Sequence, residues 1–160
     1  MDATELAKMI EAAFPPTLPS GAITLREGNQ VDTSYAVTSP SPASEHFEDW
    51  HIIPDAYIEE HHWGLRYLDR EAWLFHLPRF MSYSLLHAHD AGAMVVDETI
   101  SNLRPADTPD RHLRALSAQQ KAVVRAFLEF LAFDSTSAYQ TDATQALEEY
   151  WIENPLYPDP

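Results

Sequence analysis

The chain has 160 residues, of which 45% are apolar and 11% aromatic, so it is long enough and apolar enough to fold as one domain around a core. It contains no cysteine, which excludes disulfides and thiolate metal sites and leads us to expect a cytoplasmic protein. The net charge of −15 disfavours nucleic acid as a ligand, and the lack of a signal-like N-terminus or a long apolar run predicts no membrane insertion.

The N-terminal segment contains one clear helix followed by a weaker pattern. Leu6, Ile10 and Phe14 recur at helical spacing, with Asp2 and Glu5 as a capping-box pair and two prolines that end the helix. Apolar residues alternate over residues 22–38, which is typical of strands. We therefore expect a minor β-hairpin there, with an interrupted helix as the alternative.

Several helices are predicted in the middle of the chain. Ser41 or Ser44 would cap a short helix that runs to Trp50, and Pro54 would open another that runs towards His61. A long helix apolar on nearly all sides is expected over residues 70–89, where the interior Pro78 should kink it or split it in two. Residues 94–103 suit a short helix or a strand.

The C-terminal part contains the clearest helix. Ser117 and Gln120 form a capping box before the apolar face of "AVVRAFLEFLAF", and a final helix is predicted with Asp142 and Gln145 as its cap pair. Two central apolar helices surrounded by shorter amphipathic ones indicate a mainly α fold. We expect residues 1–160 to form a single compact multi-helix domain.

The chain resembles a bacterial family of small acidic proteins, the domain-of-unknown-function family numbered 6714. The resemblance covers most of the length and is carried by "IEAAFP", "LREGNQVD", "DWHIIPD", "LRYLDREAWLFHLPRFM", "LSAQQKAVVRAFLEFL" and "ALEEYW". Its most specific element is the aromatic–His–Leu–Pro motif at Phe75–Pro78. No reaction and no cofactor come with this resemblance.

The histidines are the candidates for chemistry. His76 has no metal ligand or nucleophile at helical spacing, so we interpret it as a buried structural histidine. The clusters "EEHH" (59–62) and "HAHD" (87–90) contain metal-ligand types, but their histidines are one or two residues apart rather than three or four. We therefore predict no metal and no catalytic residues, and interpret these histidines as helix C-terminal groups.

The charge is segregated along the chain. Residues 27–65 hold eight acids and no Lys or Arg, and residues 126–160 hold seven acids and none. A basic protein surface would be attracted to such segments. The first segment interleaves carboxylates with aromatics, which suits an interface. The predicted partner-binding residues are Glu45, Glu48, Asp49, Trp50, Asp55, Glu59 and Glu60.

Three functions are compatible with this pattern. The leading hypothesis is a binding protein of the inhibitor or immunity type, which masks a basic toxin or nuclease. The second is a metal- or ligand-dependent enzyme that uses the histidine clusters, and the third is an adaptor whose acidity only keeps it soluble. Trp50 and Trp63 could also be core residues rather than contact residues.

Overall fold

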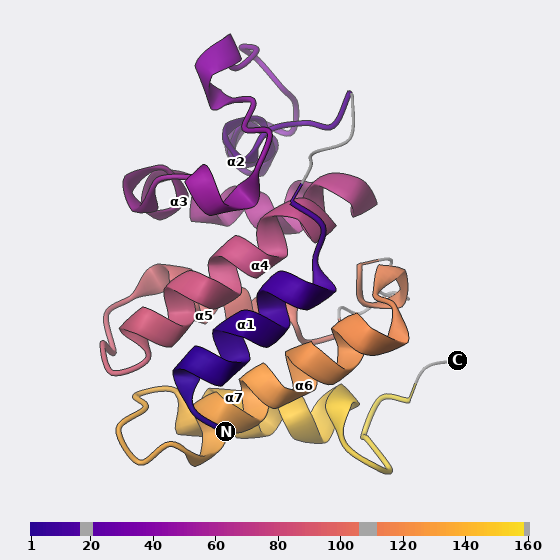
Figure 1. Cartoon of the computed structure of the whole chain (residues 1–160). Coiled ribbons are helices and arrows are strands. Elements are labelled where there is room, and N and C mark those ends of the chain that lie inside the picture. The colour runs from indigo at the N-terminus through magenta and orange to yellow at the C-terminus, as the bar shows by residue number, and fades with distance from the viewer. Residues whose placement is uncertain (17–20, 106–111, 159–160) are drawn as a thin grey trace.

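The computed structural model describes residues 1–16, 21–105 and 112–158, and within these ranges it contains helices and no strand (Figure 1). The mainly α fold and the single compact domain are confirmed. None of the helices described has the length and apolar character needed to cross a membrane. The α-helices are α1 (Ala3–Ala13), α2 (Leu25–Ser34), α3 (Asp55–His61), α4 (Arg70–His87), α5 (Met94–Asn102), α6 (Ala118–Phe133) and α7 (Gln140–Ala146).

Shorter helical turns connect these elements. Four are 3₁₀ turns: η1 (Ala43–Glu45), η2 (Trp50–Ile52), η3 (His62–Tyr67) and η4 (Leu113–Ala115). A π turn, η5 (Leu147–Trp151), follows α7 directly.

The core lies around α4 and α6, the two helices that the sequence marks as most apolar. α4 buries eleven of its eighteen residues, and α6 buries seven of its sixteen. α1 packs against both of them through Leu6 and Ile10. α5 packs on α4, and α7 packs on α6, which completes the body of the domain. Burial on several sides is why α4 shows no single apolar stripe.

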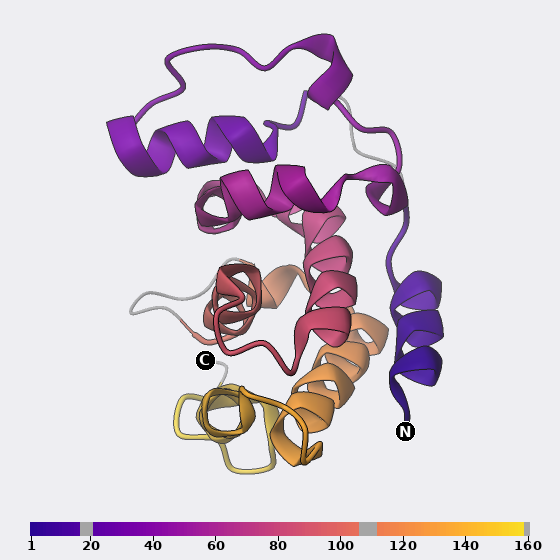
Figure 2. The same cartoon turned by 90° about the vertical axis from the view of Figure 1, so that its left-hand side faces the viewer.

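A separate layer covers one end of this body. Residues 21–67, which include α2, α3 and η1 to η3, lie across the end of α4 in both views (Figures 1 and 2). We call residues 21–67 the acidic layer. Within it α2 crosses η3 at backbone contact, because a Cβ on Gly28 would lie 2.5 Å from the carbonyl oxygen of Gly64. Two glycines at the crossing point are what allow this close approach.

The largest difference from the sequence-based expectation concerns residues 22–38. The structure shows no β-hairpin there, and α2 occupies residues 25–34 instead. Thr24 accepts a hydrogen bond from the backbone of Glu27 while Glu27 accepts one from the backbone of Thr24, which is a complete capping box. This cap, and not the alternating apolar residues, sets the local structure.

Smaller differences concern element ends. The helix expected to run up to Trp50 is replaced by the separate turns η1 and η2. Pro78 does not split α4, which continues to His87. Residues 94–102 are helical, and α7 begins at Gln140, before the predicted Asp142 cap. The caps predicted for α1 and α6 are both present.

Candidate functional site

The two segments without Lys or Arg lie at opposite ends of the molecule. Residues 27–65 belong to the acidic layer at one end, and residues 126–158 include the C-terminal part of α6, α7 and η5 at the other (Figures 1 and 2). The nearly neutral middle of the chain separates them. Each acidic segment therefore presents its charge on its own part of the surface. Solvent-exposed charges more than about 10 Å apart are largely screened from each other by salt, so the two segments act separately.

Two of the seven predicted partner-binding residues lie inside the acidic layer. The ring of Trp50 is buried, with 2% of the residue exposed, and it belongs to the core. The side chain of Glu45 is 14% exposed and forms an ion pair of 2.7 Å with Arg26. Neither side chain projects from the surface into solvent. For Trp50, the structure agrees with the core alternative.

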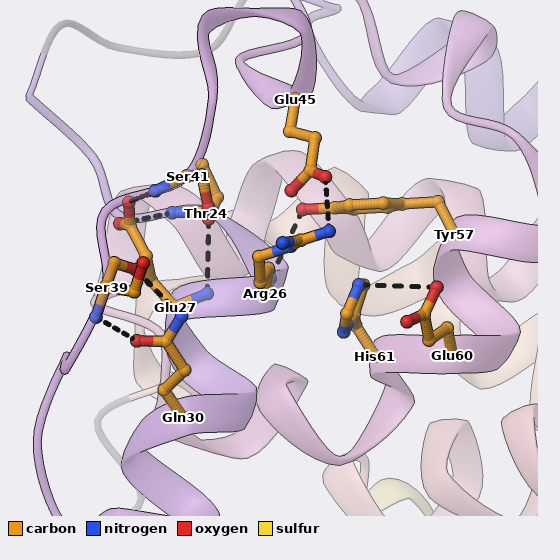
Figure 3. Close-up of polar contacts among 10 residues, drawn as sticks. All are labelled: Thr24, Arg26, Glu27, Gln30, Ser39, Ser41, Glu45, Tyr57, Glu60 and His61. Atoms are coloured by element: carbon orange, nitrogen blue, oxygen red, sulfur yellow. Dashed lines mark hydrogen bonds and ion pairs between the residues drawn. The ribbon is translucent and has the colours of Figure 1, made fainter.

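The other five residues reach the surface in the same layer. Asp49 caps η2 by accepting from the backbone of His51, and Asp55 forms an ion pair with Arg79 of α4. Glu59 accepts a hydrogen bond of 2.8 Å from the hydroxyl of Tyr83. Glu48 and Glu60 are exposed, and neither makes a hydrogen bond with a residue that the structure describes. The dashed line in Figure 3 marks the 3.8 Å between Glu60 and Nε2 of His61, which is beyond hydrogen-bond distance. These last two carboxylates are the most available to a partner.

Polar contacts hold α2 to the loop that follows it (Figure 3). The carboxylate of Glu27 accepts from the backbone N–H groups of Thr24 and Ser41, at 3.1 and 3.0 Å. The side-chain amide of Gln30 donates to the carbonyl of Ser39 and accepts from its backbone N–H. Because Glu27 is buried by these contacts, it adds little to the exposed acidic surface.

A second polar cluster joins α2 to η1 and α3 (Figure 3). The backbone N–H of Arg26 donates to the Tyr57 hydroxyl, and the Arg26 guanidinium pairs with Glu45. The ring of His61 lies edge-on to Tyr57, with centroids 4.9 Å apart. Burial lowers the pKa of His61 and raises that of Tyr57, so both groups are neutral at pH 7.

This cluster leaves polar atoms without hydrogen bonds among the described residues. They are Nε of Arg26, Oε2 of Glu45 and both ring nitrogens of His61. Each such buried atom costs about 1–3 kcal/mol relative to a satisfied one. The cluster contains a neutral imidazole and a phenol but no nucleophile, so we regard it as the polar attachment of α2 to α3.

His76 is buried, as predicted. Its Nδ1 lies 2.8 Å from the carbonyl oxygen of Ala72, and because a carbonyl can only accept, the neutral ring carries its proton on that nitrogen. The acceptor is thus the carbonyl of Ala72, one turn earlier in α4. Burial lowers the pKa of His76 to about 4. The ring is therefore neutral at physiological pH.

The histidine clusters differ from one another in environment. His61 and His62 are buried, while His89 is exposed and His87 stacks on Tyr83. His62 Nδ1 lies 2.8 Å from the carbonyl oxygen of Glu59, as expected for a histidine at a helix end. No three His, Asp or Glu side chains in the described residues are grouped as a metal site would require.

The acidic layer also exposes aromatic side chains that the sequence analysis did not single out as a group. Tyr35 is 92% exposed, and Trp63 and Tyr67 are partly exposed. Tyr35 ends α2 with a φ of 60°, a left-handed conformation that is unusual for a bulky residue. The side chain of Asp32 raises the pKa of the Tyr67 hydroxyl. Only recognition of α2 as a helix would have placed Tyr35 at its end.

The comparisons with known proteins give one match. None of the curated proteins and none of the solved structures compared with the chain matches it. A family model described as "Family of unknown function (DUF6714)" matches residues 2–155, which is nearly the whole chain. The resemblance noted from the sequence motifs is thereby confirmed, and the chain belongs to this family.

Proposed function

We propose that the chain binds a basic protein partner through the acidic layer and acts as an inhibitor or immunity-type protein that masks a toxin or nuclease. The observation that carries this proposal is that a segment with no Lys or Arg folds as one layer at one end of the domain. The role is one of binding and not of catalysis. We place it in the cytoplasm, in keeping with the absence of cysteine.

The geometry of the layer supports recognition of positive charge. Glu48 and Glu60 are exposed carboxylates without hydrogen bonds to the described residues, so a partner's Lys or Arg can contact them without breaking an existing bond. Such exposed charges mainly accelerate association and select the orientation of the partner. The exposed rings of Tyr35 and Trp63 add the aromatic area on which binding energy usually concentrates.

A matched pair of charge reversals tests the proposal. The variant Glu48→Lys/Glu60→Lys changes the acidic layer, and Glu148→Lys/Glu153→Lys changes the opposite end by the same charge at exposed positions. Both variants should unfold like the wild type, since these carboxylates make no hydrogen bonds with the described residues.

The readout begins with proteins that the tagged wild-type chain retains from a lysate of its source cells. A basic protein retained by wild type and by the opposite-end variant, but not by the layer variant, is the expected result. Its association rate should fall by about tenfold or more in the layer variant at low salt, and depend less on salt. Equal association rates for all three chains would exclude the acidic layer as the binding face.

A further inference from the structure

A pocket of about 380 Å³ lies between α1 and α4 and reaches η2. We call it the α1–α4 pocket. Its apolar lining comes from Ala7 of α1, Trp50 of η2, and Leu85 and Leu86 of α4. Leu86 is 71% exposed, so it forms part of the open rim of the pocket. The volume is at the small end of the range for binding pockets, about 300–1,000 Å³, and suits one large apolar side chain better than a cofactor.

Carboxylates from three elements lie around this pocket. Glu11 of α1 is part of the lining, and Asp49 caps η2, which also contributes to the lining. Asp55 of α3 pairs with Arg79, which also lines the pocket. Because Trp50 and His51 of the lining belong to residues 21–67, the pocket is continuous with the acidic layer.

The bases at the pocket are already engaged. Arg79 lines the pocket, but its Nε donates to the carbonyl of Ile53 at 2.8 Å and its Nη2 pairs with Asp55. His51 also lines it, and its Nδ1 is hydrogen-bonded to Asp49. Lys8 of α1 lies outside the lining. An apolar pocket with a negative surround is the complement of an apolar side chain flanked by Lys or Arg.

We propose that the α1–α4 pocket receives a leucine or phenylalanine side chain from a basic segment of the partner, whose cationic residues contact the surrounding carboxylates. This inference rests on the proposed function and adds the chemistry that the partner must present. A second copy of the chain is a poor occupant, because two molecules of net charge −15 repel each other. A buried apolar anchor surrounded by charges is the common form of an interface hot spot.

Two synthetic peptides of about 15 residues provide the probe. The first is an amphipathic helix with lysines on one face and leucine and phenylalanine on the other, and the second replaces those apolar residues with alanine at the same charge. The indole N–H signal of Trp50 in the ¹⁵N-labelled chain reports on the pocket, with Trp73 and Trp151 as internal references in the core. We expect the first peptide to shift the Trp50 signal and the alanine peptide to leave it unchanged.

Filling the pocket should weaken this binding. Ala7→Trp should weaken binding of the first peptide about thirtyfold, as loss of a hot spot does. Ala122→Trp, at an exposed position of α6, is the matched control and should have no effect. If Ala7→Trp unfolds, Thr4→Trp fills the pocket from an exposed position of α1. Equal binding of both peptides, or no binding of either at low salt, would overturn the inference.

The outcomes separate this inference from the proposed function. If the captured partner is lost on reversal of Glu48 and Glu60 but not on filling the pocket, the acidic layer binds the partner and the pocket has no part in it. If neither change affects the partner, both proposals fail. A dimer in sedimentation that Ala7→Trp disperses would assign the pocket to a second copy and overturn the inference.

Discussion

Replacing His76 with asparagine would remove a titratable group from the core while keeping a donor close to the carbonyl of Ala72. In the wild type the ring is buried, and burial lowers its pKa from 6.5 to about 4. Asparagine places an N–H group near the position of the imidazole Nδ1–H but does not take up a proton. The variant therefore isolates the contribution of protonation from that of the hydrogen bond.

The size of the effect follows from the two pKa values of His76. Below pH 6.5 the unfolded chain binds a proton at this ring, whereas the folded chain does so only below about pH 4. Acidification across this window therefore favours unfolding. Since each pH unit corresponds to about 1.36 kcal/mol, the interval is worth about 3 kcal/mol in the free energy of unfolding.

Urea denaturation of both proteins between pH 7 and pH 4 measures this quantity. Other groups titrate in the same range, but both proteins contain them, so most of their effect cancels in the difference. The wild type should be the more stable at pH 7, and its advantage should shrink by about 3 kcal/mol as the pH falls to 4. A difference that stays constant with pH would refute a buried neutral His76.

Two further predictions concern backbone geometry. Gly64→Ala should destabilise the folded chain by about 2–3 kcal/mol, because the added Cβ would meet the backbone oxygen of Leu25. A thermal melt should therefore show a lower melting temperature than that of the wild type. The control Gly92→Ala should leave the melting temperature nearly unchanged, because a Cβ there meets no backbone atom. Tyr35→Gly should raise the free energy of unfolding by about 1 kcal/mol in urea, because glycine adopts the left-handed φ of 60° without strain; an unchanged or lower value would contradict this reasoning.

The parts of the fold that local patterns specify could be predicted from the sequence. The capping boxes of α1 and α6 depend on residues three positions apart, and both are present as expected. The burial of His76 follows from the apolar residues on all sides of its helix. These features need no information about distant parts of the chain.

The parts that depend on distant contacts could not be predicted. The capping box that begins α2 is local, but the position of the helix is set by the contact of Gly28 with Gly64, which are far apart in the chain. The inward orientation of Glu45 depends on its ion pair with Arg26. The sequence does not show this pairing, so Glu45 could not be told apart from the surface carboxylates. The α1–α4 pocket depends on how α1, η2 and α4 are placed relative to one another. The sequence shows that α1 carries small residues such as Ala7, but it does not show this placement.

The weak apolar anchoring of α2 has a consequence for its motions. Leu25 is the only large apolar side chain that this helix buries, and its remaining attachments are caps, polar contacts and the glycine crossing. A segment held in this way opens locally at a lower free energy than core helices such as α4. Its amides are therefore expected to exchange with solvent hydrogen ahead of those in the body of the domain. The acidic layer is thus expected to change conformation more readily than the core around α4.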